Sequence, residues 1–185
     1  MLTTERLIVR PFSANDYQDL YEYLSLKETY RFEPGEPVSL EEAKKISAER
    51  ARGMDFWAVT LKDKNDKLIG HISFIQMEPR HFLTREIGFI FNPAFQNKGY
   101  ATEAARSLIA YAFRELGAHR VVGYCSPENT PSWRVLEKCG MKREGLQRKS
   151  AFFRKDEDGN PIWLDSYAYA ILAEDFFKES PDSSP

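Results

Sequence analysis

The residues best suited to chemistry lie at positions 96–101, where a strand-like run passes into a strongly amphipathic segment. Gly99 allows the backbone to bring N–H groups close to an anion, and the small Ala101 leaves room for it. The free N–H groups and the dipole of the following helix would complement negative charge. The segment lacks the Gly-Lys-Ser/Thr ending and the Gly-x-Gly-x-x-Gly spacing of commoner phosphate loops. It therefore predicts a pyrophosphate-binding turn of another type.

This pattern resembles the acetyl-coenzyme A loop of the GNAT N-acetyltransferase superfamily, and the resemblance extends over most of the chain. Further segments are similar to the branch that contains the ribosomal-protein alanine and serine N-terminal acetyltransferases. They are an opening strand at 4–11, a cofactor-binding strand at 86–89, an Asn-x-x-Ser…Leu-Glu-Lys-x-Gly segment at 129–141, and a closing strand at 163–169. Four matches in the right order are hard to obtain by chance.

The resemblance implies a single-domain α+β fold of the GNAT type, with helices flanking a mixed, mostly antiparallel sheet whose central strands splay apart. It also implies acetyl-coenzyme A as co-substrate, with its pantetheine arm in the split and its pyrophosphate on the backbone amides of the turn. The implied cofactor-binding residues are Phe89, Ile90, Phe91, Gln96, Asn97, Lys98, Gly99, Tyr100, Ala101, Thr102, Asn129 and Ser132.

Direct attack of an amine on a thioester requires a base or a water chain, and donors for the oxyanion. The resemblance implies a carboxylate base near the start of the cofactor strand, where Glu86 stands. The neighbouring Ile-Gly-Phe run could raise the pKa of this carboxyl group towards the working range. The alternative is a structural carboxylate paired with Arg85 or Arg80. A backbone N–H near Phe89 or Ile90 would serve the oxyanion.

Two polar residues before the segment 132–138 have both structural and functional interpretations. Asn129 resembles the family asparagine that binds pantetheine or a water molecule, or it is a turn residue. Ser132 is a candidate catalytic residue near the cofactor, or the N-cap of its helix. The position of the usual general acid, a tyrosine, holds Leu136. Ser132, Tyr124 or solvent would then protonate the thiolate, or no acid is needed.

Composition excludes several classes. The chain has 185 residues, 42% of them hydrophobic, which suits one domain with a sizeable core. Lys plus Arg total 26 against 28 Asp plus Glu, so no basic field for nucleic acid exists. Two cysteines, Cys125 and Cys139, and no apolar leader or membrane-spanning stretch predict a reducing cytoplasm. The histidines lack zinc-site spacing, so no metal is expected.

The elements that position these residues follow from periodicity and capping signals. Helices are predicted from Ser13 to about residue 24, then at 39–52, 101–116 and 132–138, and strands at 7–10, 56–61, 68–75, 85–91, 120–125, 142–153 and 163–172. Residues 1–177 would form the N-acetyltransferase domain, and 178–185 a mobile tail.

The acceptor is the least defined part. Glu33 and Glu36, in the predicted loop 30–38, could attract a cationic amine, or could simply be solvated. A protein N-terminus and small amines such as polyamines, amino sugars and antibiotics all remain candidates, because fold does not choose among them. Two other hypotheses are a catalytically silent acyl-coenzyme A sensor and a nucleotide hydrolase, the latter without its lysine-serine pair. The sequence allows a monomer or a homodimer.

Overall fold

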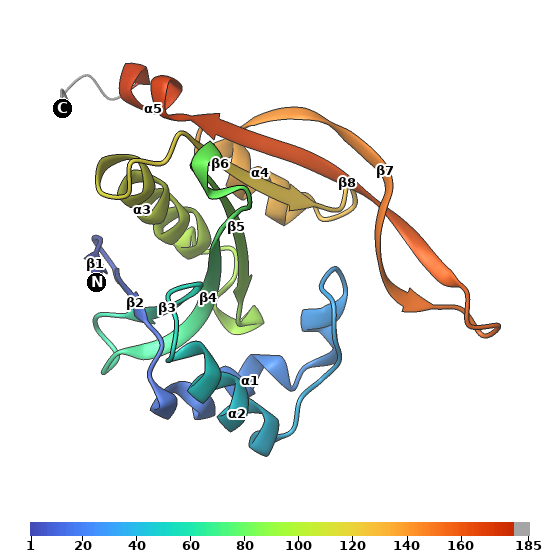
Figure 1. The fold of residues 1–185 in the computed structure, drawn as a ribbon. Coiled ribbons are helices and arrows are strands. Elements are labelled where there is room, and N and C mark those ends of the chain that lie inside the picture. Colours follow the sequence, from blue (N-terminus) through green and yellow to red (C-terminus); the bar gives the residue numbers. More distant parts are fainter. Residues whose placement is uncertain (180–185) are drawn as a thin grey trace.

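The structure, a computed structural model that describes residues 1–179, is built around an eight-stranded sheet in the order β1-β2-β3-β4-β5-β6-β8-β7 (Figure 1). The strands are β1 (Leu2–Thr3), β2 (Leu7–Pro11), β3 (Phe56–Leu61), β4 (Lys67–Gln76), β5 (Thr84–Phe91), β6 (Arg120–Cys125), β7 (Lys142–Lys155) and β8 (Pro161–Leu172). Within the described residues, neighbouring strands are antiparallel except β5 and β6, which run parallel. A mixed, mostly antiparallel sheet was predicted, and it is confirmed.

Helices cover both faces of this sheet. The α-helices are α1 (Tyr17–Leu24), α2 (Leu40–Arg50), α3 (Tyr100–Arg114), α4 (Thr130–Lys138) and α5 (Ala173–Glu179), and the short 3₁₀ turns are η1 (Ala14–Asp16), η2 (Lys27–Tyr30), η3 (Arg80–Phe82) and η4 (Pro93–Phe95). Apolar residues of α3, α4 and α5 pack in one hydrophobic cluster, and those of α1 and α2 in a second. We call the face of the sheet that carries the first cluster the α3 face, and the face that carries the second cluster the α1/α2 face.

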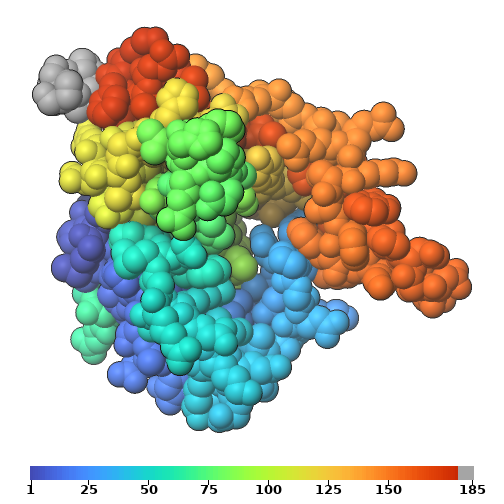
Figure 2. All heavy atoms as spheres, in the orientation of Figure 1, coloured from blue at the N-terminus to red at the C-terminus, as the bar shows by residue number. Residues whose placement is uncertain are grey.

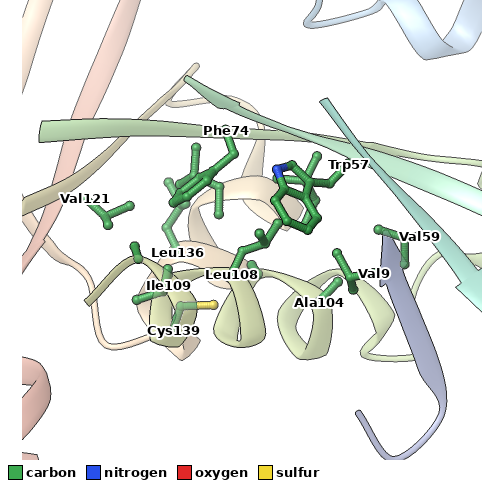
Figure 3. Packing of buried hydrophobic residues seen from close by; sticks show 14 of the residues in the cluster. Val9, Trp57, Val59, Phe74, Ala104, Leu108, Ile109, Val121, Leu136 and Cys139 are labelled. Atoms are coloured by element: carbon green, nitrogen blue, oxygen red, sulfur yellow. The ribbon is translucent and has the colours of Figure 1, made fainter. Parts of the chain in front are cut away.

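Strand alternation assigns side chains to these two faces. Trp57 and Val59 of β3 belong to the cluster on the α3 face, whereas Ala58 between them belongs to the cluster on the α1/α2 face. On the α3 face, Trp57 and Phe74 lie over Leu108 (Figure 3), and all three are buried. The predicted spacing of apolar residues along α3 is thus what fixes this helix against the sheet.

The central strands splay as predicted. β5 pairs with β6 only over Thr84–Arg120, Arg85–Val121 and Glu86–Val122, although β5 continues to Phe91 and β6 to Cys125. We call the diverging residues, 87–91 of β5 and 123–125 of β6, the fork. On its other edge β5 pairs with β4 along its whole length, so only the edge towards β6 has open backbone groups.

Several boundaries differ from the sequence-based expectation. The helix expected at 132–138 begins at Thr130, and the one expected to reach residue 116 ends at Arg114 because the chain turns there before Gly117, at φ +60°. Lys178 and Glu179, placed in the tail by the sequence, belong to helix α5, which was not anticipated. The remainder of the predicted tail, 180–185, lies outside the described residues.

The β7–β8 hairpin extends away from the body of the molecule (Figures 1 and 2). Figure 2 shows a hollow between its orange atoms and the light-blue segment around residues 30–40. The two sides touch where the Arg154 guanidinium donates a hydrogen bond to the Tyr30 carbonyl, at 2.5 Å. The loop that the sequence predicted as an acceptor entrance therefore faces this hairpin.

Candidate active site

The predicted pyrophosphate turn, residues 96–102, leads directly from β5 and η4 into α3. Gly99 is the N-cap of α3 with φ +82°, a left-handed conformation that glycine adopts without strain, and Asn97 also has positive φ. Because Gly99 has no side chain, no side-chain acceptor caps the first turn of the helix. The first intrahelical bond runs from the Glu103 N–H to the Gly99 carbonyl. The amides of residues 100–102 are thus available to an anion.

An arginine that the sequence analysis did not select holds this turn in place. Arg6 donates from Nε to Glu103 Oε2 at 2.7 Å and from Nη1 to the Lys98 carbonyl at 3.0 Å. Its guanidinium also lies 4.6 Å from the centroid of the Tyr100 ring. The Thr4 hydroxyl donates to the same Glu103 carboxylate at 2.6 Å. The residues before β2 therefore clamp the start of α3.

The side chains within the turn are occupied by local contacts. Gln96 Nε2 donates to the Phe91 carbonyl at 2.9 Å, and Lys98 Nζ donates to the Ala94 carbonyl at 3.1 Å. Beside the turn, a groove of about 580 Å³ is lined by Arg6, Gly99, Thr102, Arg106 and Lys138, among others. Arg6, Arg106 and Lys138 line this groove together with the carboxylates of Glu5 and Glu103, and Arg6 is paired with Glu103. The Lys98 ammonium is folded back onto its own loop.

Glu86 lies at the point where the fork begins, since its pairing with Val122 is the last between β5 and β6. Burial raises the pKa of its carboxyl group, as the sequence analysis anticipated. Within residues 1–179 its carboxylate has no hydrogen bond or ion pair: Arg80 pairs with Glu78, and the Arg85 guanidinium lies over the Phe74 ring. The alternative of a structural pair with Arg85 or Arg80 is therefore not supported.

Beyond Glu86, the side chains of β5 alternate between the two clusters. Phe89 and Phe91 pack in the α3 face, and Ile90 packs in the α1/α2 face. The side chains of all three predicted cofactor residues on β5 therefore pack in the core. What they can offer a ligand in the fork is their backbone N–H and C=O groups, which bind an extended chain as a neighbouring strand would.

On the other side of the fork, Asn129 rather than Ser132 is the N-cap of α4. Asn129 Oδ1 accepts from the Ser132 N–H at 3.4 Å, and Pro131 occupies the first turn, where its fixed φ suits a helix start. The interpretation of Ser132 as N-cap is wrong. Burial raises the pKa of the Cys125 thiol to about 11, partly offset by the Ser132 hydroxyl, so this cysteine is a poor nucleophile at neutral pH.

Two residues, Leu136 and Tyr124, bear on which group could act as the general acid. Leu136 is 2% exposed and packs against β6, so close that a Cβ on Gly123 would lie 3.1 Å from its Cδ2. Tyr124, by contrast, is 40% exposed and is two residues beyond Val122 on the same face of β6. Because Val122 is the register partner of Glu86, the Tyr124 hydroxyl and the Glu86 carboxylate belong to the same face of the sheet.

That face, the α1/α2 face, is closed near α1 and open near Glu86. His71 is buried beneath α1, with its Nδ1 2.6 Å from the Tyr23 hydroxyl, and burial lowers its pKa well below the usual value. Further along β4 and β5 come the paired residues Ser73–Gly88 and Ile75–Glu86, none of them buried. The uncovered part of the face therefore begins beside the fork.

The two predicted acceptor-loop glutamates differ. Burial raises the pKa of Glu33 to about 7, and within residues 1–179 its carboxylate has no hydrogen bond or ion pair. Glu36 is exposed. Among residues 1–179 there is no group of three or more His, Cys, Asp or Glu side chains that could hold a metal ion, and no helix long and apolar enough to cross a membrane.

Comparison with known proteins gives a consistent result. A sequence profile described as an acetyltransferase (GNAT) domain matches residues 6–142. The uncharacterized N-acetyltransferase YnaD of Bacillus subtilis (strain 168) is 42% identical over 95% of this chain and 98% of its own length. The crystal structure of a GNAT-family acetyltransferase from Bacillus anthracis superposes with a TM-score of 0.83 and 38% identity, covering 94% of this chain and 98% of that one.

A more distant relative has a named acceptor. The [ribosomal protein uS5]-alanine N-acetyltransferase of Escherichia coli (strain K12) is 26% identical over 95% of this chain and 92% of its own length.

Proposed function

The chain belongs to the acetyltransferase (GNAT) family, and from this premise we propose that it transfers acetyl from acetyl-coenzyme A directly to a primary amine at the fork, with Glu86 as base. The family, the N-acetyltransferase activity and the fold predicted from the sequence are confirmed, and the ribosomal-protein branch is a distant homologue. GNAT enzymes use acetyl-coenzyme A. The observation that carries the proposal is an unpaired carboxylate with a raised pKa at the point where the strands part.

The cofactor would run from the pyrophosphate turn along β5 to Glu86. The amides of residues 100–102 would hold the pyrophosphate, with Arg106 and Lys138 adding positive charge and Arg6 keeping the turn in place. From Phe91 back to Glu86 the strand spans about 17 Å, at about 3.3 Å a residue. The open backbone edge of the fork would bind the extended pantetheine arm over this length and bring the thioester towards Glu86.

In the reaction, the amine nitrogen attacks the thioester carbonyl and the carbon–sulfur bond breaks. The Glu86 carboxylate accepts the proton that the amine loses, directly or through water. A raised pKa suits this role, because it makes the group a stronger base than an ordinary glutamate. A backbone N–H near Phe89 or Ile90 would stabilise the oxyanion. The Tyr124 hydroxyl, which shares a face with Glu86, or solvent would protonate the leaving thiolate.

The acceptor would enter from the α1/α2 face, between the loop 31–39 and the β7–β8 hairpin. Acceptors to be tested are the N-terminal amine of a ribosomal or other protein and small amines. Glu33, whose carboxyl group has a pKa of about 7 and no counter-charge within residues 1–179, supports an acceptor that arrives as an ammonium ion.

The experiment measures release of the coenzyme A thiol from acetyl-coenzyme A with one panel of amines. The panel contains peptides that begin with serine, alanine or threonine, then lysine, polyamines and aminoglycosides, and cofactor binding is measured in parallel. Turnover with one acceptor class supports the proposal and identifies the class. Tight cofactor binding without turnover on any amine would instead favour an acyl-coenzyme A sensor.

A further inference from the structure

One charged side chain near the α1/α2 face has no use in the mechanism above. Arg50 is the last residue of α2, and its guanidinium lies 4.3 Å from the centroid of the Phe56 ring and 5.3 Å from that of Phe12. None of its guanidinium N–H groups donates to an acceptor within residues 1–179, and Nη1 is buried without a partner. In that same part of the chain, no other buried side-chain nitrogen or oxygen is left unsatisfied.

The stability of the fold does not fully explain why the Arg50 guanidinium is buried without an acceptor. The two aromatic rings attract the cation, and a positive charge suits the C-terminal end of a helix. Neither satisfies the five donors of a guanidinium, and a buried donor without an acceptor destabilises the folded state. Burial also lowers the pKa of Arg50, and the nearby Tyr23 and Tyr30 hydroxyl groups offset this only in part. An arginine held this way has the donor geometry for a planar anion.

The location connects Arg50 to the fork. Phe56, over which the guanidinium lies, pairs with Ser73, and Ser73 pairs with Gly88. Three neighbouring strands thus place these residues in one row across the α1/α2 face, and a Cβ built on Gly88 would lie 2.7 Å from Ser73 Oγ. Two strand spacings amount to about 10 Å. Gly88 is two residues from Glu86, on the same face.

We infer that Arg50 binds a carboxylate on the acceptor, so that the substrate is an amine that carries its own carboxylate. This inference rests on the proposed function and narrows it. The amine lies beside Glu86 and Gly88 and the carboxylate at Arg50. The row from Phe56 to Gly88 sets the scale of the separation between the two groups, about 10 Å of backbone spacing. An amine whose carboxylate lies several bonds away spans a separation on this scale, and a polyamine offers no group for Arg50.

The test compares acceptors that differ only in the carboxylate. Straight-chain ω-amino acids are assayed beside alkylamines of the same chain length, so that the basicity of the amine stays similar, and kcat/KM is expressed as the ratio within each pair. Free α-amino acids and peptides with an acidic second residue distinguish the sources of the carboxylate. The variants are Arg50→Met, which keeps the length and apolar stem, and the matched control Arg52→Met, at an exposed arginine beyond the same helix.

We expect kcat/KM to be about ten to a hundred times higher for the ω-amino acid than for the alkylamine of the same length, which is the usual contribution of a hydrogen bond between charged groups. In Arg50→Met the ratio falls to near one, through KM of the amino acid, and in Arg52→Met it is unchanged. Because the ratio is internal, a general loss of activity does not imitate this result. The melting temperature of Arg50→Met is unchanged or raised, since a buried unsatisfied donor is removed.

Two results would overturn the inference while leaving the proposed function intact: a ratio near one in the unmodified protein, or an equal ratio in Arg50→Met. If no amine is acetylated, the proposed function fails separately, and the carboxylate site is then tested by thermal shift with N-acetylated ω-amino acids. A rise in melting temperature that Arg50→Met removes supports the site, and its absence refutes it.

Discussion

Replacing Glu86 by glutamine tests the base with little structural disturbance. The carboxylate has no ion-pair or hydrogen-bond partner within residues 1–179, so the substitution removes a charge without leaving another group unpaired. The pyrophosphate turn begins about 17 Å or more along the strand. We therefore expect the affinity for acetyl-coenzyme A to change by less than about twofold, and kcat to fall by about 10²- to 10⁴-fold, the range for loss of a general base.

The size of the loss depends on the amine. At pH 7.5 about a third of a protein N-terminal amine is already neutral, whereas only about one lysine-type amine in a thousand is. The deficit in Glu86→Gln is accordingly larger for an alkylamine than for an N-terminal peptide, and it shrinks as the pH approaches the pKa of the amine. In the unmodified enzyme the rate falls as the pH drops through the raised pKa of Glu86, because the protonated group accepts no proton. The variant lacks this limb.

The assay is thiol release from pH 5.5 to 10, with Glu115→Gln, an exposed carboxylate after α3, as the control. Stability gives an independent reading. A carboxyl group whose folded pKa is raised disfavours folding once it ionises, so Glu86→Gln should melt at a higher temperature than the parent at pH 8 and equally at pH 4. A deficit below threefold, or one that is the same at every pH and for every amine, would refute the assignment of Glu86 as base.

Three further changes separate structural from functional roles. Asn129→Ala removes the α4 cap and costs about 1 kcal/mol, measured by chemical unfolding, whereas Asn129→Asp keeps the cap and lowers cofactor affinity only if the amide donates to pantetheine. Arg6→Met is expected to raise KM for acetyl-coenzyme A about tenfold with kcat preserved. Its cost in stability is at most about 1 kcal/mol, because the ion pair with Glu103 is partly exposed. The control Arg80→Met, which removes a surface ion pair, leaves KM unchanged. Glu33→Gln stabilises the protein by about 2 to 3 kcal/mol at pH 8, where the carboxyl group with its folded pKa of about 7 is ionised, and has no effect at pH 4. The control Glu36→Gln, at an exposed residue, leaves stability unchanged at both pH values.

The local parts of the site could be predicted from the sequence, and the long-range parts could not. Gly99 and the helix after it are adjacent in the chain, so their types and spacing define the turn. Arg6 reaches that turn from more than 90 residues away, and no local pattern reveals it. The sequence indicated only Ser132 as a candidate cap of α4, because the helix was expected to begin there, and the earlier start at Thr130 makes Asn129 the cap instead.

Burial without a partner is likewise a property of the fold. In the sequence Arg50 is an ordinary basic residue near a helix end, and Glu86 stands out only through the family resemblance. Only the fold brings the Arg50 guanidinium between the Phe12 and Phe56 rings. Only the register of β5 with β6 places Glu86 where the fork begins.

Glu33, Glu86 and Arg50 share a physical conflict that an acceptor with two charges would resolve. Glu33, Glu86 and Arg50 are each partly buried without a counter-charge in the described chain, and a protein selected for stability alone would replace such groups by neutral ones. A simple amine satisfies the carboxylates and leaves Arg50 unpaired, whereas an amine with a carboxylate satisfies both signs of charge. An amino-acid acceptor should therefore raise the melting temperature more than the matching alkylamine does, and this difference should disappear in Arg50→Met.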